Sequence, residues 1–112
     1  MDTIITYYAK LVYEFPDEKY QKVIDELKEI PEIQKFFYYV SKDQEFQKRK
    51  RIEYINYDLK VNLRFDKEAR EIIVEYDGWF IEKDEFDFLV KVIKVLNKYG
   101  SIKKIIKEYV FE

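Results

Sequence analysis

Apolar and polar residues alternate along the beginning of the chain. Residues 3–15 are rich in β-branched and aromatic types, and every second residue from Ile5 to Phe15 is apolar. This alternation predicts a strand. Ile4, Tyr8 and Phe15 also fit one stripe of a helix, so a helix is the competing interpretation. We favour the strand.

Two helical patterns follow. Pro16 suits the first turn of a helix, where its missing N–H removes no hydrogen bond, and apolar residues recur at helical spacing over residues 20–27. Pro31 ends this helix. The same spacing returns over residues 33–40 and predicts a second helix.

The clearest alternation covers residues 55–65, where apolar and polar residues follow one another strictly. This pattern predicts one long, half-buried strand. A tight turn then returns the chain as a strand over residues 70–76. If Leu63 faces Ile72, the apolar sides of the two strands coincide, so we predict this register.

A few residues mark the boundaries of the elements predicted for residues 77–100. Residues 77–78 predict a second turn, and residues 79–82 predict a short third strand. Asp84 is the expected N-cap of a helix that extends to Tyr99, and Gly100 is expected to end it.

The last segment has isoleucines and a tyrosine at helical spacing, so we predict a final helix over residues 101–109. The expected fold is a single α+β domain over residues 1–112, in the order β-α-α-β-β-β-α-α. Its antiparallel sheet has three to four strands, with helices packed on one face.

Composition argues against an enzyme. The chain has no histidine, no cysteine and only two glycines. It therefore lacks an imidazole for proton transfer, a thiol nucleophile and a glycine-rich phosphate loop. Carboxylates are plentiful, but helix capping and cross-strand pairing explain the clusters. We expect no catalytic residue, no metal and no cofactor.

The net charge is −2, so no overall field draws the chain to nucleic acid or to an anionic membrane. No apolar run is long enough to span a membrane, and no basic leader precedes Asp2. We therefore expect a cytoplasmic protein without membrane contact. The many lysines, glutamates and isoleucines, with few glycines, are typical of a thermophilic archaeon or one of its viruses.

One short run of cations suggests nucleic-acid binding. Phosphates need clustered cations, and single strands need aromatic side chains on which bases stack. The predicted binding residues are Lys48, Arg49, Lys50, Arg51, Tyr54, Lys60, Asn62 and Arg64. The competing interpretation is that the run is a solvated loop and that the cations on the strand form ion pairs with acidic residues of the same protein. In the predicted register Arg64 lies opposite Glu71, and Lys60 lies opposite Glu75.

The helix over residues 84–99 has an unusually wide apolar surface. A sheet covers one apolar stripe of a helix, and further apolar residues extend around this helix beyond that stripe. The last helix or a second subunit must cover them. For a homodimer the predicted interface residues are Phe88, Val92, Val95 and Tyr99.

The pattern over residues 59–99, with LKVNLRF, EIIVEY and WFIEKDEFDFLVKVIKVLNKY, resembles small single-strand DNA-binding domains of archaea and their rod-shaped viruses. ThermoDBP-like, coactivator-type and whirly-like domains share twisted antiparallel strands that lead into an amphipathic helix. The resemblance implies that a sheet face binds single strands and that the helix dimerises.

Two functions are therefore expected from the sequence. The first is a non-enzymatic nucleic-acid-binding protein, with single-stranded DNA or RNA as its partner. The alternative is a dimeric protein-interaction module, such as a small viral or plasmid factor that acts on a host protein. The wide apolar helix and the negative net charge favour the alternative.

Overall fold

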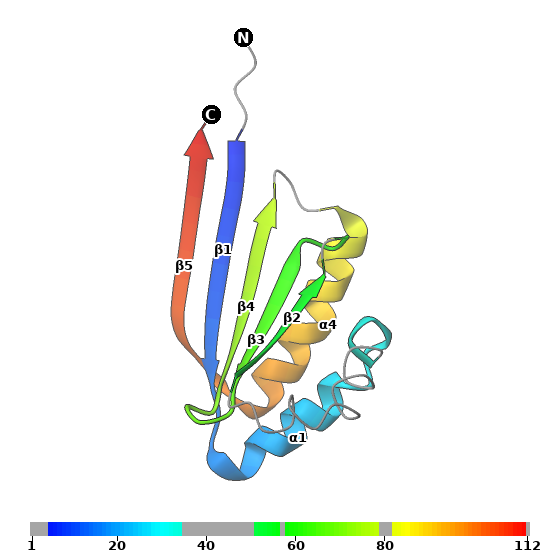
Figure 1. Ribbon diagram of the computed structural model, residues 1–112, viewed down its shortest axis with the longest axis vertical. Coiled ribbons are helices and arrows are strands. Elements are labelled where there is room, and N and C mark those ends of the chain that lie inside the picture. Colours follow the sequence, from blue (N-terminus) through cyan, green and yellow to red (C-terminus); the bar gives the residue numbers. More distant parts are fainter. Residues whose placement is uncertain (1–4, 35–50, 57, 79–81, 112) are drawn as a thin grey trace.

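The computed structural model describes residues 5–34, 51–56, 58–78 and 82–111. Within these residues the protein is an α+β fold built on a five-stranded antiparallel sheet (Figure 1). Along the chain the elements are β1 (Ile5–Glu14), α1 (Asp17–Leu27), β2 (Arg51–Asn56), β3 (Val61–Asp66), β4 (Glu71–Gly78), α4 (Lys83–Tyr99) and β5 (Ser101–Phe111).

The strands lie in the order β2-β3-β4-β1-β5. The predicted first strand is confirmed as β1, which pairs with β4 on one side and with β5 on the other. Both partners come later in the chain. The strand interpretation therefore prevails over the helical stripe because β1 gains hydrogen-bonding neighbours on both sides, which a helix at this position would forfeit.

The predicted strand over residues 55–65 is wrong, because the chain turns within it. The side-chain oxygen of Asn56 accepts a hydrogen bond from the backbone N–H of Leu59 (3.0 Å), and Lys60 takes a positive φ of 56°. Such Asx geometry starts a turn. Two short strands, β2 and β3, result. The turn also reverses the alternation, since Tyr54 is buried while Ile55 is exposed.

The hairpin of β3 and β4 is present, but its register differs from the predicted one by two residues. Leu63 pairs with Val74 instead of Ile72, and Arg64 lies opposite Ile73 instead of Glu71. A shift of two residues keeps every side chain on its face. The apolar sides therefore still coincide, and this is why the sequence pattern alone could not distinguish the two registers.

The predicted last helix is a strand. β5 runs antiparallel to β1 along its whole length, from Ser101 opposite Glu14 to Phe111 opposite Ile5. A bulge between Val12 and Tyr13 interrupts the register near the beginning of β5. The sheet therefore has five strands where three to four were expected, and the described elements run β-α-β-β-β-α-β.

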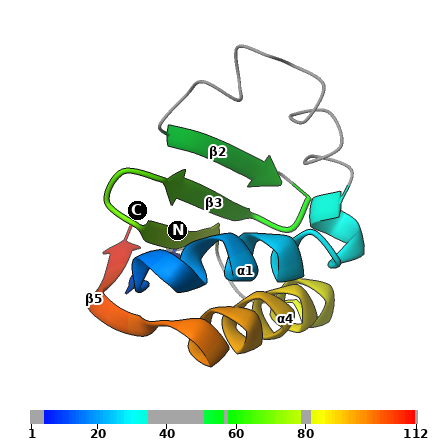
Figure 2. The same cartoon turned by 90° about the horizontal axis from the view of Figure 1, so that it is seen from below.

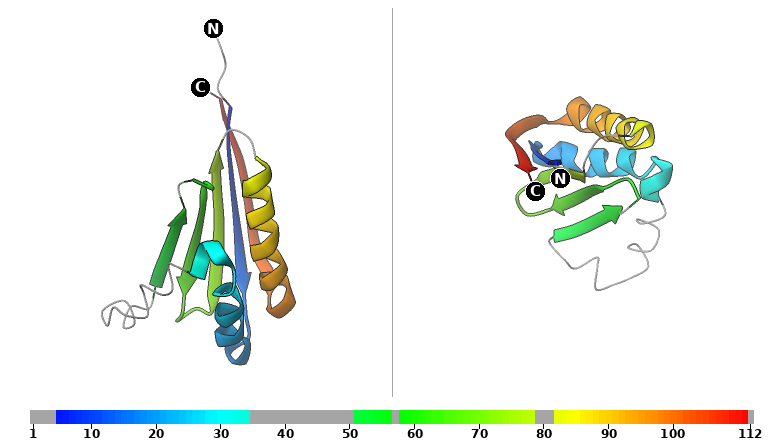
Figure 3. Two further views of the ribbon diagram at one scale, coloured as in Figure 1. Left: turned by 90° about the vertical axis from the view of Figure 1, so that its right-hand side faces the viewer. Right: turned by 90° about the horizontal axis from the view of Figure 1, so that it is seen from above.

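Helices α1 and α4 lie on the same side of the sheet (Figures 2 and 3). We call the side they cover the inner face and the opposite side the outer face. The buried core lies between the helices and the inner face. Its largest fully buried side chains include Tyr13, Phe65, Phe88, Leu27, Ile33 and Leu63.

Polar contacts hold the two helices against each other and against β1. Lys98 of α4 pairs with Glu26 of α1 (Nζ–Oε1 2.7 Å). The hydroxyl of Tyr13 on β1 donates a hydrogen bond to the side-chain oxygen of Asn97 on α4 (2.8 Å). These contacts fix the orientation of helices whose main stabilisation is apolar burial.

Helix α4 begins earlier than predicted and ends where expected. Glu82, not Asp84, is its N-cap, and Gly100 is its C-cap. Gly100 has an extended backbone (φ −138°), so it is not required for a left-handed conformation. A Cβ at this position would lie 2.4 Å from the ring of Phe15 and 2.5 Å from the backbone oxygen of Glu14. Glycine is needed here for close packing.

Two predicted elements lie mainly outside the described residues. A short helical segment covers residues 31–34, and the rest of the predicted second helix falls outside the described part of the chain. The predicted third strand, residues 79–82, also falls outside it except for Glu82. Among the described helices, none has the length and apolar character needed to cross a bilayer.

Candidate interaction surfaces

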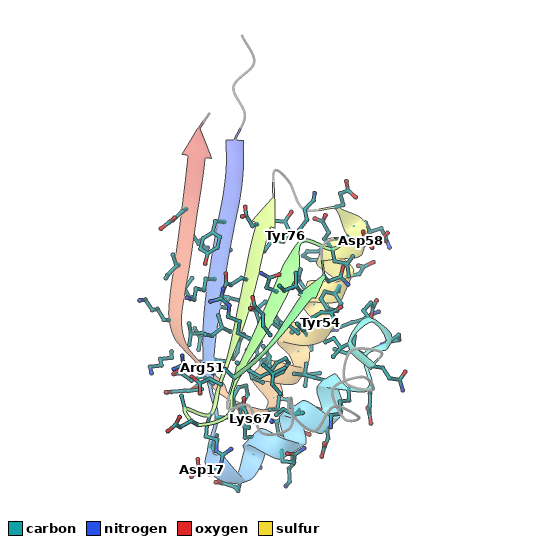
Figure 4. All side chains as sticks on the ribbon, viewed as in Figure 1. Asp17, Arg51, Tyr54, Asp58, Lys67 and Tyr76 are labelled. Atoms are coloured by element: carbon teal, nitrogen blue, oxygen red, sulfur yellow. The ribbon has the colours of Figure 1, made fainter. Side chains whose placement is uncertain are left out.

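The outer face carries two of the cations that the sequence assigned to nucleic acid, Arg51 and Arg64. Lys48, Arg49 and Lys50 lie outside the described residues. Arg51 begins β2, and its side chain is 84% exposed with Nε 3.4 Å from a carboxylate oxygen of Asp66. Figure 4 labels Arg51 toward the lower part of the sheet.

Arg64 sits between two carboxylates on the outer face. Its Nε lies 3.3 Å from Oε1 of Glu53 and 3.2 Å from Oε1 of Glu75. The hydroxyl of Tyr8 donates to the other oxygen of Glu75 (3.2 Å). Burial and the adjacent Glu75 raise the pKa of Tyr8, so it stays a neutral donor. A phosphate would have to compete with both carboxylates for Arg64.

Tyr54 lies on the inner face, where no base can stack on it. It is buried beside Phe88, with ring centroids 6.5 Å apart, and its hydroxyl donates to the backbone oxygen of Glu32 (3.0 Å). The sequence placed Tyr54 on the solvent side because the turn after Asn56 was missed. Its predicted role as a stacking residue is therefore inconsistent with the structure.

Lys60 belongs to a buried cluster that the sequence did not reveal. Its Nζ lies 3.2 Å from Oε1 of Glu85, which is only 2% exposed. The hydroxyl of Tyr76 (2.9 Å) and the backbone N–H of Glu82 (3.1 Å) both donate to Oε2 of Glu85. The carboxylate is thus bound by three groups from the β2–β3 turn, β4 and the start of α4.

The electrostatics of this cluster favour the charged form of Glu85. Burial on its own would raise the pKa of this carboxyl, but the N–H of Glu82, the hydroxyl of Tyr76 and Lys60 outweigh it and lower the pKa. Burial and the same carboxylate raise the pKa of Tyr76. The cluster is therefore an ionised, hydrogen-bonded anchor between sheet and helix.

Two hollows lie along the sheet. One, of about 340 Å³, is lined by Tyr8, Ile55, Asn56, Lys60, Asn62, Glu75 and Asp77. The other, of about 580 Å³, is lined by Arg51, Ile52, Glu53, Arg64, Phe65, Asp66 and Ile73. Each mixes acidic and basic groups. In the described part of the chain, no three carboxylates converge to form a metal site.

The predicted dimer residues on α4 lie against the chain's own core. Phe88 and Val92 are fully buried, while Val95 and Tyr99 are half-buried and pack on the same core. Phe88 and Val92 therefore offer no surface to a second subunit. The sheet and α1 cover more of the helix than one stripe, because α4 packs on both.

Exposed apolar residues are instead concentrated at other positions. Ile105 of β5 is 53% exposed and Ile102 is 44% exposed, and both lie on the inner face opposite residues of β1. Phe86 of α4 is 56% exposed. The sequence assigned the isoleucines of β5 to a covered helix, so this surface was missed.

The free side of β5 is the most unusual feature of the sheet. Among the described strands, β5 is the last in the sheet order and pairs with β1 alone. It spans 11 residues, which is long for an edge strand. We call the side of β5 that does not pair with β1 the β5 edge. Figure 1 shows β5 and β1 running together beyond the other strands.

No protein-family model, curated protein or solved structure matches this chain. Function must therefore be inferred from the surfaces themselves.

Proposed function

We propose that this chain is a non-enzymatic protein-interaction module that binds another polypeptide by adding a strand to the β5 edge. The observation that carries the proposal is the length of this edge, 11 residues, together with the exposed Ile102 and Ile105 beside it. The module needs no catalytic group, cofactor or metal.

An edge strand has the physical means to bind an extended chain. Within the described sheet its outward-pointing N–H and C=O groups have no strand to pair with, so a second strand can form a ladder of hydrogen bonds with them. Native proteins usually shorten, bulge or cover such an edge. Here a bulge lies at Val12–Tyr13, and residues from Lys104 onward keep a regular register with β1.

Side chains beside the edge add a hydrophobic contribution. Residues of an added strand alternate between the two faces of the sheet. Those on the inner face would lie next to Ile105, which is opposite Leu11 on β1. Covering an exposed isoleucine side chain contributes up to about 1.5–3 kcal/mol. Hydrogen bonds would thus set the direction of the bound strand, and apolar contacts would supply affinity.

The outer face supports nucleic-acid binding less well. Arg64 is held by two carboxylates and Lys60 by the buried Glu85. Removing Lys60 from Glu85 would leave a buried charge without its cation, which is costly. A polyanion would have to compete with both arrangements.

A synthetic peptide that copies residues 101–111 tests strand addition. We expect titration with the unlabelled peptide to shift the backbone amide signals of β5 in the full chain. We also expect outward-facing β5 amides to be protected from hydrogen exchange when a strand is bound. The matched control is the same peptide N-methylated at alternate residues, which cannot form the ladder. The proposal would be contradicted if the peptide shifted no β5 amide signal and the outward-facing β5 amides exchanged freely at every protein concentration.

Single-strand nucleic-acid binding is the second candidate function. The observation in its favour is Arg51, whose side chain is 84% exposed and lines the larger hollow together with Arg64. Arg51 directly follows Lys48, Arg49 and Lys50 in the sequence. Its pair with Asp66 leaves the arginine side chain in solvent, so this contact is easily exchanged for one with a phosphate.

Fluorescence anisotropy with labelled single- and double-stranded oligonucleotides at two salt concentrations tests this second function. Binding through the outer face should weaken with salt and should weaken further in Arg51→Ala and Arg64→Ala. Lys94→Ala is the matched control, since this exposed lysine lies on α4, on the other side of the sheet. Absence of binding at low salt would exclude the function.

A further inference from the structure

We propose that the strand added to the β5 edge is β5 of a second copy of this chain. The two strands would run antiparallel about a two-fold axis midway between the two copies of Ile106, so that two sheets join into one. This inference rests on the proposed function, and it names the partner. The alternative partner, a strand of a different protein, is one outcome of the test below.

Symmetry restricts how two copies of β5 pair. Two antiparallel neighbouring strands related by a two-fold axis require that axis to stand perpendicular to the sheet. The inner faces of both copies then lie on the same side. Paired residues must also share a face, so the axis passes midway between one residue and the same residue of the second copy. Each choice of central residue is a separate register.

The charges on β5 favour one of these registers. With Ile106 at the centre, Lys104 lies opposite Glu108 of the second copy, and Glu108 lies opposite the second copy's Lys104. Both residues are exposed, and in the described part of the chain no ion pair involves either of them. Opposite charges at directly paired positions stabilise an antiparallel ladder.

Neighbouring registers place like charges together. Centring the axis on Ile105 brings Lys103 opposite Lys107, and centring it on Lys107 or Glu108 brings that residue opposite itself. Like charges directly opposite each other are destabilising. The register centred on Ile106 avoids this, and it is the register in which the strand is complementary to itself.

Lysines on an edge strand usually prevent pairing with another strand. In the register centred on Ile106, each lysine of β5 has a favourable neighbour. Lys103 is already bound to Glu71 of its own chain (Nζ–Oε2 2.8 Å). Lys104 would gain Glu108 of the second copy. Lys107 would lie opposite the second copy's Ile105, where its aliphatic stem can cover that exposed side chain.

Charge reversal and mixing test the inference. Sedimentation equilibrium of the wild type should give a concentration-dependent mass between that of one chain and that of two. Lys104→Glu puts four carboxylates at the two paired sites, and Glu108→Lys puts four ammonium groups there. Each change should raise the dimer Kd about tenfold or more.

The decisive sample is a mixture of the two variants. In a heterodimer, both glutamates of the first variant face lysines of the second, so mixing should restore dimers that neither variant forms alone. The double variant Lys104→Glu/Glu108→Lys should also dimerise as the wild type does. Circular dichroism melts of each variant check that these exposed substitutions leave the chain folded.

Three outcomes would overturn the inference. They are a wild type that stays monomeric, charge-reversed variants that dimerise with the wild-type Kd, and a mixture that shows no heterodimer. A monomeric wild type whose β5 amides respond to the peptide of residues 101–111 would leave strand addition intact with a different partner. A monomeric wild type that ignores this peptide would overturn the proposed function as well.

Discussion

The ammonium group of Lys60 lies 3.2 Å from Oε1 of Glu85 and so joins the turn between β2 and β3 to the first turn of α4. The same carboxylate accepts hydrogen bonds from Tyr76 and from the backbone of Glu82. One buried anion therefore connects the sheet to its longest helix. Lys60, which the sequence assigned to phosphate binding, therefore stabilises the contact between the sheet and α4.

Glu85→Gln should lower the free energy of unfolding at neutral pH by about 1–3 kcal/mol, because an amide replaces an anion that Lys60 and two N–H or O–H donors surround. Urea denaturation measures the change. The matched control is Asp84→Asn, which removes the same charge from an exposed neighbour and should cost less than about 1 kcal/mol. Equal losses in the two variants would contradict a special role for Glu85.

The effect of Glu85→Gln should depend on pH. The folded protein lowers the pKa of this carboxyl below its ordinary 4.5. Its stabilisation is therefore complete above pH 4.5 and is lost as the pH falls through the lower, folded-state pKa. Denaturation curves of wild type and variant should be well separated at neutral pH and converge in acid. A gap that stays constant across this range would show that the carboxylate is not the cause.

Val92→Glu should unfold the chain and not merely separate a dimer. Val92 is fully buried, and an unpaired carboxylate there should cost about 3–5 kcal/mol. The comparison is Phe86→Ser on the same helix, where the side chain is exposed and the cost should stay near 0.5 kcal/mol. Thermal melts followed by circular dichroism distinguish the two. A folded Val92→Glu variant would mean that this face of α4 is accessible.

Gly100→Ala should destabilise the chain by about 1–3 kcal/mol, because the added methyl group overlaps the ring of Phe15 and the backbone oxygen of Glu14. The neighbouring Ser101→Ala, at an exposed position, should change stability by less than about 0.5 kcal/mol. Chemical denaturation of both variants provides the test. A harmless Gly100→Ala would mean that the junction between α4 and β5 has room to adjust.

Tyr54→Phe should lower stability by about 1 kcal/mol, since the backbone oxygen of Glu32 loses its donor. Tyr8→Phe is the comparison on the outer face, where Arg64 continues to neutralise Glu75, and its cost should be smaller. Both variants should bind oligonucleotides as the wild type does if Tyr54 is inaccessible to bases. A binding defect confined to Tyr54→Phe would show that Tyr54 contacts nucleic acid and is not inaccessible.

The sequence predicted the α+β class because alternation and helical spacing report burial directly. β1, α1, α4 and the β3–β4 hairpin follow from it. The missed turn at Asn56 had a signal, because Asn56 and Asp58 are residue types that favour turns over strands. The strict alternation of the surrounding residues concealed it.

β5 could not be recognised from its own residues. Ile102, Ile105 and Ile106 fit a helical stripe, and strand pairing places Ile105 and Ile106 on opposite faces. The unpaired side of β1, more than 80 residues earlier in the chain, decides between the two. Similarly, the position of Lys60 beside Glu85 depends on the packing of α4 against the sheet, which local spacing does not encode.

The place of β1 in the sheet has a consequence for how the chain folds. β1 is made first, yet both strands that flank it come later, and the last of them ends at Phe111. Its hydrogen bonds with β5 close a loop that contains every other described element, and such long-range contacts slow folding. During synthesis on the ribosome one side of β1 therefore stays unpaired until β5 has emerged.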